Sequence, residues 1–246
     1  MTKKIAVVTG GMGGIGQAIC RSLHQQNINV VAAYNRSHEA ALKWQQTEKE
    51  SGFDFHIIHV DVANSDSCIN MITQIENTIG PIDILINNAG ITRDISFCKM
   101  QKDDWDIVIN TDLNSVFYVT QAVINKMKAR NYGRIINISS INGQRGQFGQ
   151  VNYAAAKAGM HGFTKALALE VAKHGITVNT VSPGYVATEM VLTLPENIRE
   201  KIRTEIPVGR FAEPDEIARV VTFLIDENNS FITGANIPIN GGQYMS

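Results

Sequence analysis

The chain has 246 residues, a length that suits one large α/β domain better than two small ones. Hydrophobic residues make up 44% of it, which is enough for a buried core, and 22 Lys and Arg residues nearly cancel 23 Asp and Glu residues. So neutral a chain has no electrostatic footprint for nucleic acid or for an acidic membrane surface. We therefore expect a small-molecule partner, with neither nucleic acid nor membrane bound.

Cysteine usage and the first residues indicate the compartment. The chain has three cysteines that lie far apart in the sequence, Cys20, Cys68 and Cys98. We therefore expect a reducing compartment and no disulfide framework. The apolar stretch at residues 5–8 is too short for the core of a secretion signal, and no segment approaches the length of a membrane span. We expect a cytoplasmic protein.

Short runs rich in β-branched residues alternate with longer helical segments along the whole chain. The runs predict strands at Ile5–Thr9, Asn29–Tyr34, Phe55–Val60, Ile82–Asn87, Arg134–Ser139, Thr177–Ser182 and Asn236–Ile239. The segments predict helices at Gly14–Gln26, Glu39–Ser51, Ser65–Ile79, Lys102–Arg130, Tyr153–His174, Pro195–Glu205 and Pro214–Asp226.

This alternation is typical of βαβ units, and several strands are apolar on both faces, as in a buried parallel sheet. The expected fold class is α/β, with residues 1–246 forming a single Rossmann-type domain whose doubly wound parallel sheet carries helices on both faces. Ligands of such sheets bind beyond the carboxyl ends of the strands, so functional residues are expected just after each strand.

A glycine-rich turn follows the first predicted strand. It satisfies both GxGxxG and TGxxxGxG, and it stands where backbone N–H groups and a helix N-terminus would meet a dinucleotide pyrophosphate. Gln17 stands where a phosphate-transferring P-loop would have lysine, so that alternative is disfavoured. The candidate cofactor residues of the turn are Gly10, Met12, Gly13, Gly14, Ile15 and Gly16.

The end of the second strand bears on cofactor choice. An NAD site would have Asp or Glu here to bind the ribose 2′-hydroxyl, and the segment Tyr34–Ser37 has none. Arg36 instead suits a 2′-phosphate, with Asn35 beside it as a neutral donor. We therefore predict NADPH over NADH, against the alternative that Arg36 is a solvated loop charge.

The third and fourth strands end in further candidate cofactor residues. Asp61 can accept from the adenine amino group, with Val62 beside it. After the fourth strand, Asn88, Ala89 and Gly90 would let the backbone lie against the cofactor. Taken alone, this run would be read as a turn. Its place after a buried strand favours the cofactor role.

Three residues carry candidate chemistry for carbonyl reduction. Tyr153 and Lys157 are four residues apart on a predicted helix and so share one face, and Ser140 follows the fifth strand. A nearby ammonium and an oxidised nicotinamide ring both favour the phenolate and bring tyrosine toward a useful acid–base range. Lys157 can also hold the nicotinamide ribose, and Ser140 can donate to the substrate oxygen.

Five features in order resemble the short-chain dehydrogenase/reductase superfamily, and the resemblance covers the whole chain. They are TGxxxGxG at Thr9–Gly16, Asn87-Asn88-Ala89-Gly90, Ser140 thirteen residues before Tyr153, Tyr153-x-x-x-Lys157, and Ser182-Pro183-Gly184. The resemblance implies that Tyr153 is the general acid, Lys157 its partner and ribose ligand, and Ser140 the substrate-oxygen donor. It also implies that Pro183, Gly184 and Val186 border the nicotinamide, that Thr188 lies near the carboxamide, and that the protein is a homotetramer.

One position departs from the superfamily pattern, which usually has Asn-Leu where this chain has Asp112-Leu113. The usual asparagine helps to position a water that links the catalytic lysine to solvent. If the main-chain carbonyl at this position holds that water, aspartate can replace asparagine without loss. If the amide itself is needed, proton supply suffers, and a carboxylate nearby alters the protonation of the lysine. Both alternatives stay open at the level of the sequence.

A finer resemblance concerns the substrate. Asn142–Tyr153, Gly90–Asp94 and Pro183–Tyr185 resemble the acetoacetyl-CoA reductases of polyhydroxyalkanoate synthesis, which form (R)-3-hydroxybutyryl-CoA. The resemblance implies that the acyl and pantetheine path is lined by Asp94, Gln147, Phe148, Gly149, Gln150, Gly184 and Tyr185. Glutamine amides and a phenylalanine ring suit a thioester with a short acyl chain. The alternative is that residues 147–150 form a structural loop.

Segment 188–207 is a candidate lid, and its Arg199, Lys201 and Arg203 are possible ligands of CoA phosphates. The rival function is a 3-oxoacyl-ACP reductase of fatty acid synthesis, in which basic surface around Lys126, Lys128 and Arg130 would meet the acidic carrier. A rival of another class is a catalytically idle nucleotide-sensing protein on the same fold. No metal is expected.

Overall fold

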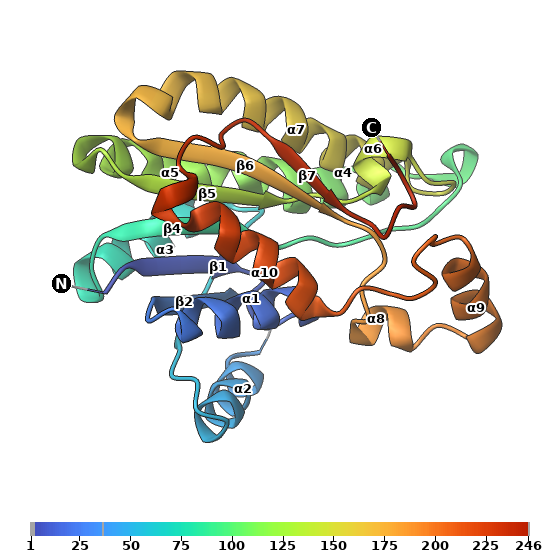
Figure 1. Ribbon diagram of the computed structural model, residues 1–246, viewed down its shortest axis with the longest axis horizontal. Helices are drawn as coiled ribbons and strands as arrows, with labels where there is room; N and C mark the ends of the chain where they lie inside the picture. The colour runs from blue at the N-terminus through green and yellow to red at the C-terminus, as the bar shows by residue number, and fades with distance from the viewer. Residues whose placement is uncertain (1–2, 36, 246) are drawn as a thin grey trace.

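The computed structural model describes residues 3–35 and 37–245 and contains one seven-stranded parallel sheet (Figure 1). The strand order is β3-β2-β1-β4-β5-β6-β7. The bounds are β1 Ile5–Thr9, β2 Asn29–Tyr34, β3 His56–His59, β4 Ile82–Asn87, β5 Gly133–Ile138, β6 Ile176–Pro183 and β7 Asn236–Ile239. The predicted α/β class with a doubly wound parallel sheet is confirmed.

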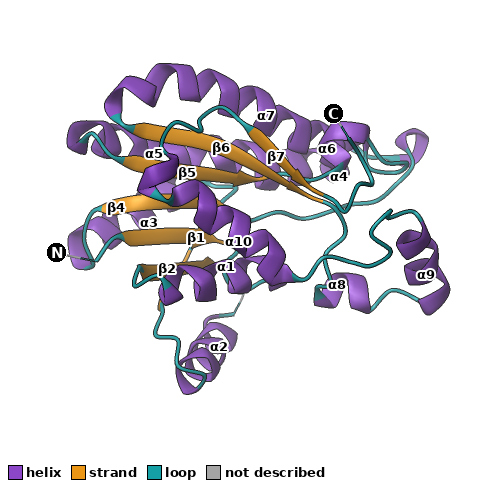
Figure 2. Ribbon diagram, viewed as in Figure 1, coloured by secondary structure: helices purple, strands orange, loops and turns teal. Residues whose placement is uncertain are grey.

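Helices cover both faces of the sheet, as the crossovers between parallel strands require, and leave its central strands no contact with water (Figure 2). Every residue of β1, β5 and β6 is buried. The longer helices are α1 Gly14–Gln25, α2 His38–Glu50, α3 Ser65–Thr78, α4 Lys102–Ile109, α5 Ser115–Arg130, α7 Val151–Val171, α9 Glu196–Thr204 and α10 Pro214–Ile225. The shorter helices are α6 Asn142–Arg145, α8 Glu189–Leu192 and the 3-10 turns Phe97–Lys99, Ala172–His174 and Glu227–Asn229.

Two hydrophobic cores lie on opposite sides of the sheet. On one side, apolar residues of α3, α5 and α7 pack on the strands, as Met71, Val123 and Val171 do. On the other side α1 and α10 supply the core, for example through Leu23 and Val221. Helices on both faces hold the strands rigidly, so the loops at their carboxyl ends start from fixed positions.

The structure refines three of the predicted elements. The helix predicted at Lys102–Arg130 is interrupted by a π-helical turn at Asn110–Asn114, which we call the π turn. Helix α7 begins at Val151, two residues earlier than expected, so Tyr153 lies in its first turn. Strand β3 is shorter than predicted because only His56–His59 pair with β2, the one neighbour of this edge strand.

Strand direction places the functional loops at one edge. The chain segments that follow β1, β4, β5 and β6 all leave the sheet at its carboxyl edge, as parallel pairing requires. Helices α6, α8 and α9 lie beyond this edge, on the right in Figure 1. Among the described residues, no helix is long and apolar enough to cross a membrane.

Candidate active site

Tyr153, Lys157 and Ser140 meet at the carboxyl edge of the sheet. Ser140 lies two residues after β5, and Tyr153 and Lys157 lie one turn apart at the start of α7. The Ser140 hydroxyl lies close enough to Tyr153 to lower the pKa of its phenol. The Ser140 hydroxyl also accepts from the backbone N–H of Asn142, at 3.1 Å, which fixes the serine at the start of α6.

Lys157 is buried and held from two sides. Its Nζ donates to the carbonyl oxygen of Ile138 at 3.0 Å and lies 3.3 Å from Oδ2 of Asp112. It also lies 5.4 Å from the centroid of the Tyr153 ring. The ammonium is therefore fixed beside the phenol, as the i, i+4 spacing predicts.

Burial dominates the pKa of Tyr153. Removal from water raises this pKa above the ordinary value, the Lys157 ammonium lowers it, and the Asp112 carboxylate raises it again. The lysine acts in the expected direction, but it does not bring the pKa of Tyr153 below the ordinary value when no ligand is bound. The lowering that the sequence predicts, by the lysine together with an oxidised nicotinamide ring, stays a prediction for the cofactor-bound protein.

Burial lowers the pKa of Lys157, but the negative charge of Asp112 and the effect of Tyr153 more than offset this, and the net pKa is raised. The pKa of Asp112 is also raised, because burial outweighs the lysine and the hydrogen bond from the Ile91 N–H. The protein thus holds a cationic lysine beside a buried carboxylate.

The glycine-rich turn has the close backbone approaches that its sequence predicts. Gly10 has a φ of +62°, in the left-handed region that favours glycine. A Cβ at Gly16 would collide with the carbonyl oxygen of Gly10, so α1 can start this near β1 only with glycine there. Gly13 and Gly14 are exposed at the start of α1. This leaves the helix N-terminus accessible to an anion, so the turn fits a dinucleotide pyrophosphate.

The segment after β4 is tied to the glycine-rich turn. The Asn88 side chain donates to the carbonyl oxygens of Thr9 and Gly10, at 3.0 and 3.1 Å. The Thr9 hydroxyl accepts from the backbone N–H groups of Asn88 and Ala89. The amide of Asn88 is therefore used within the protein, and its contribution to a cofactor site is to hold the shape of the turn.

The remaining candidate cofactor residues are spread along the same edge. Asn35 is exposed after β2, and Arg36 lies outside the described residues. One oxygen of Asp61 accepts from the Ala63 N–H at 3.0 Å, and Val62 beside it is buried. Two more predicted residues of the turn, Met12 and Ile15, are half-buried.

The chain after β6 returns to the glycine-rich turn. Val186 is buried and pairs with Ala212. A Cβ at Gly14 would lie 2.7 Å from Cγ2 of Thr188, so Thr188 lies directly against the start of α1. The structure thereby brings together two segments that lie more than 170 residues apart in the sequence. The other predicted residues of this segment, Pro183 and Gly184, form the end of β6 and the residue after it.

The candidate substrate residues fall into two groups. Gln150 is buried, and its amide is fully engaged: Oε1 accepts from Asn142 at 2.9 Å, and Nε2 donates to both carboxylate oxygens of Asp94 at 3.0 and 2.9 Å. Gln147 and Phe148 are exposed in the loop before α7, with Phe148 90% exposed. Residues 147–150 are thus structural at one end and accessible at the other, and the substrate role of the exposed end stays a prediction.

Tyr185 and Gly149 complete the predicted substrate set. Asp94 and Arg145 both act electrostatically on Tyr185, whose pKa is raised by burial. Gly149 accepts from the Ile95 N–H at 2.8 Å, which joins the loop before α7 to the loop after β4. These loops and the segment after β6 therefore surround one region at the carboxyl edge.

Sequence reasoning missed the part played by Asn142. Its side chain donates to Gln150 and so links α6 to the Asp94 loop, while its own Oδ1 is buried without a hydrogen-bond partner among the described residues. No local signal marks this residue, because the link joins positions far apart in the sequence. Asp112 was noticed as a departure from the superfamily pattern, and the structure places its carboxylate beside Lys157, where it raises the pKa of the lysine, as one of the two alternatives anticipated.

A family model described as short chain dehydrogenase matches residues 4–199. The chain belongs to the short-chain dehydrogenase family. Members of this family use a nicotinamide cofactor, and the glycine-rich turn fits one.

Similar proteins match this short-chain dehydrogenase over its full length. An acetoacetyl-CoA reductase of Allochromatium vinosum is 53% identical over 243 residues, covering 98% of this chain and 99% of the relative. An acetoacetyl-CoA reductase of Cupriavidus necator is 51% identical over 245 residues, covering 100% of both chains. A 3-oxoacyl-[acyl-carrier-protein] reductase of Pseudomonas aeruginosa is 44% identical over 243 residues, covering 99% of this chain and 98% of the relative.

Proposed function

We propose that the protein is an NADPH-dependent acetoacetyl-CoA reductase that forms (R)-3-hydroxybutyryl-CoA for polyhydroxybutyrate synthesis. The observation that carries the chemistry is the joining of Ser140, Tyr153 and Lys157 at one point of the carboxyl edge. The substrate follows from the two acetoacetyl-CoA reductases that are more than half identical to this chain. An intact set of these three residues also favours an enzyme over an idle nucleotide-sensing protein.

Each of the three side chains has one task in this proposal. NADPH, when bound, supplies the hydride that the carbonyl carbon receives. The Tyr153 phenol gives its proton to the carbonyl oxygen, and the Ser140 hydroxyl donates a hydrogen bond to that same oxygen as negative charge grows on it. Lys157 stabilises the resulting phenolate and holds the nicotinamide ribose. The raised pKa of Tyr153 keeps the phenol protonated, which is the form that reduction requires.

The cofactor would lie along the carboxyl edge. The backbone of Gly10–Gly16 would hold the pyrophosphate, Asp61 and Val62 the adenine, and Asn88–Gly90 the adjoining ribose. Pro183, Gly184, Val186 and Thr188 would border the nicotinamide. Asn35 and Arg36 would bind the 2′-phosphate, because no carboxylate is present there to repel it.

An Arg36→Ala enzyme is expected to lose at least about tenfold of its preference for NADPH over NADH, since a charge-assisted hydrogen bond to phosphate is removed. The measurement is the ratio of kcat/KM values for the two cofactors. Lys43→Ala is the matched control, because Lys43 is an exposed cation on α2. Equal ratios in Arg36→Ala and in the unmodified enzyme would refute the assignment.

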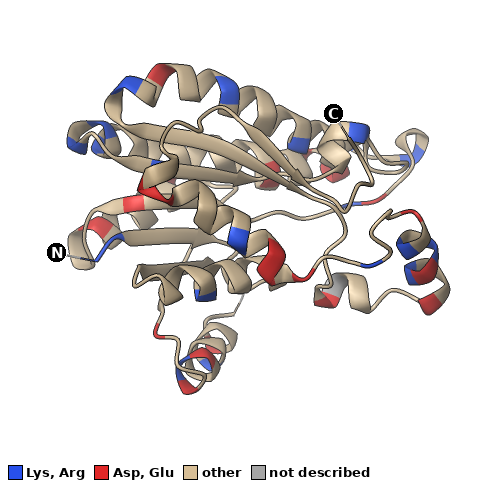
Figure 3. Cartoon of the chain, in the orientation of Figure 1, with Lys and Arg blue, Asp and Glu red and all other residues tan. Residues whose placement is uncertain are grey.

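The charge arrangement favours coenzyme A over an acidic carrier protein. Of the basic residues at the end of α5, Lys126 and Arg130 form ion pairs with Glu76, and Arg130 also donates to the carbonyl oxygen of Ile82. Ile82 begins β4, so these cations lie at the amino edge of the sheet, opposite Tyr153. Figure 3 shows blue and red residues interspersed over the molecule rather than gathered in one basic face.

The substrate would enter between the loop 147–150 and the candidate lid 188–207, with Asp94 and Tyr185 beside it. Of the lid's cations, Arg199 and Arg203 pair with Glu196 in the same helix, α9. Arg203 also pairs with Glu200, so two carboxylates offset the two guanidinium charges and Lys201 remains as the lid's contribution to CoA phosphate binding.

The decisive assay compares NADPH oxidation with acetoacetyl-CoA and with acetoacetyl-ACP at equal concentrations. We expect the CoA ester to be preferred in kcat/KM by at least about tenfold, which corresponds to roughly 1.4 kcal/mol of transition-state binding. Preference for the ACP ester would assign the protein to fatty acid synthesis with the same mechanism. No turnover of either ester would refute the proposed function.

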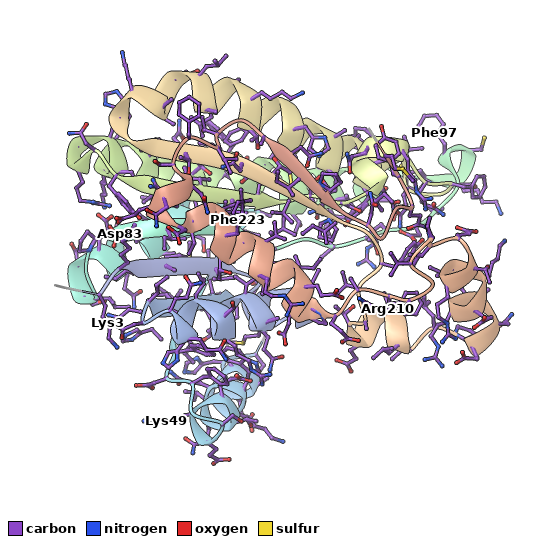
Figure 4. The ribbon with its side chains drawn as sticks, in the orientation of Figure 1. Lys3, Lys49, Asp83, Phe97, Arg210 and Phe223 are labelled. Atoms are coloured by element: carbon purple, nitrogen blue, oxygen red, sulfur yellow. The ribbon has the colours of Figure 1, made fainter. Side chains whose placement is uncertain are left out.

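Assembly and location complete the proposal, which places a homotetramer in the cytoplasm. Large apolar side chains are exposed on α5 and α7, including Phe117 at 46% and Leu169 at 86%. Phe223, near the end of α10, is 51% exposed (Figure 4). Such side chains suit burial between subunits. All three cysteines are free thiols, which suits a reducing compartment.

A further inference from the structure

Asp112 is a buried carboxylate in direct contact with Lys157. It lies in the π turn, its side chain is 0% exposed, and its Oδ2 is 3.3 Å from Nζ of Lys157. Its Oδ1 accepts from the backbone N–H of Ile91 at 2.8 Å. The loop after β4 therefore fixes one oxygen by a hydrogen bond, while the other oxygen forms an ion pair with the lysine of α7 and has no hydrogen bond among the described residues.

The local backbone is adapted to this pair. A Cβ at Gly90 would lie 2.8 Å from Oδ2 of Asp112 and 3.2 Å from Nζ of Lys157, so only glycine leaves the two charged groups their space. The π turn, in which the helix gains a residue, lies against the start of α7. Three separate segments thus meet at this one ion pair.

The position of the pair relative to Tyr153 decides its effect. Lys157 Nζ lies 5.4 Å from the centre of the Tyr153 ring. A lone ammonium at that distance would strongly favour the phenolate inside the protein, where charges are poorly screened. A carboxylate on the same ammonium turns the isolated charge into a dipole, whose field at the phenol is weaker.

We infer that Asp112 is a positioning residue that acts through Lys157 to hold Tyr153 in its protonated form, so that the enzyme works as a reductase over a wider range of alkaline pH. This inference rests on the proposed function. Reduction requires the phenol, which gives its proton to the carbonyl oxygen, whereas oxidation of the hydroxyacyl product requires the phenolate as base. Asp112 leaves the overall equilibrium unchanged and sets the pH at which each direction becomes fast.

The charged groups around Tyr153 support this inference. Lys157 lowers the pKa of Tyr153, while Asp112 raises it and Asp94, from the loop after β4, raises it by less. The Ser140 hydroxyl contributes a hydrogen bond that lowers this pKa. Of these groups, Asp112 is the one in contact with the lysine. Because asparagine has nearly the same shape as aspartate, the charge of Asp112 can be removed with little change in the shape of the site.

The test is an Asp112→Asn enzyme, in which the amide oxygen can still accept from the Ile91 N–H. We expect the midpoints of the pH profiles of kcat, for acetoacetyl-CoA reduction and for 3-hydroxybutyryl-CoA oxidation, to move together to lower pH by about one unit. Turnover in reduction near neutral pH should stay within a few-fold of the unmodified enzyme. Asp103→Asn is the matched control, because Asp103 is exposed on α4. Unchanged midpoints in Asp112→Asn would overturn the inference.

A second measurement needs no substrate. The protein has six tyrosines, and the near-ultraviolet tyrosinate absorbance of each background minus that of its Tyr153→Phe counterpart isolates Tyr153 during an alkaline titration. Tyr153 should ionise at lower pH in Asp112→Asn and also in Asp112→Ser, a second variant that removes the charge. Equal ionisation in all three backgrounds would refute the role of Asp112. Failure to turn over acetoacetyl-CoA would refute only the proposed function, because this titration stands by itself.

Discussion

A Tyr153→Phe enzyme is expected to lose about 10²- to 10⁴-fold in kcat for acetoacetyl-CoA reduction, the range that general acid catalysis contributes. The substitution removes one hydroxyl and leaves the ring in the first turn of α7, so folding and cofactor binding should persist. The measurements are steady-state turnover and, separately, binding of NADPH followed by its fluorescence.

The matched control is Tyr118→Phe. Tyr118 lies on α5 and packs against the core at the side of the sheet, so it shares the chemistry of the substitution but not the site. It should retain turnover within about twofold, as surface and near-surface changes usually do. If Tyr153→Phe kept more than a tenth of the activity, another group would have to supply the proton.

A Lys157→Met enzyme should be destabilised by about 3–5 kcal/mol at neutral pH, because removing one partner leaves the buried carboxylate of Asp112 without its cation. Catalysis should be lost as well, since the phenolate of Tyr153 loses its stabilising charge. Urea unfolding gives the stability, and the Lys157→Met/Asp112→Asn double variant should recover most of the loss because it has no stranded charge.

The sign of the pH dependence separates this explanation from a simple packing defect. The folded-state pKa of Asp112 is already raised by burial and must rise further without Lys157. A group whose pKa is raised on folding contributes stability below its unfolded pKa and loses that contribution as the pH rises through its folded pKa. Lys157→Met should therefore be less stable at about pH 8 than at about pH 5, relative to the unmodified protein. An equal loss at both values would point to packing alone.

The sequence predicted the sheet and the shared face of Tyr153 and Lys157 because these signals are local, whereas the place of Ser140 beside them followed from the family resemblance. Buried parallel strands are continuous apolar runs, and helical spacing alone brings Tyr153 and Lys157 to one face. The contact between Thr188 and Gly14 and the link from Asn142 through Gln150 to Asp94 are of another kind. They depend on how distant loops meet beyond the sheet, which residue periodicity does not encode.

The π turn was also beyond prediction, for a related reason. The segment 102–130 has a helical residue pattern throughout. Nothing in its amino-acid composition marks the turn that holds one extra residue. The departure at Asp112 was visible in the sequence. An effect of the carboxylate on the lysine was one of two alternatives at that stage, and the position of Asp112 in the π turn, 3.3 Å from Lys157, supports it.

The extra residue in the π turn also changes the phase of the helix. Each α-helical residue advances the side-chain direction by about 100°, so α4 and α5 are offset around their common axis by roughly that angle. This offset lets the two consecutive helices pack in two directions, since α4 contacts α7 while α5 contacts α3 and β4. Deleting a single residue between Asn110 and Asn114 would bring the two halves back into phase, and only one of the two packing faces would then remain in register with its neighbour.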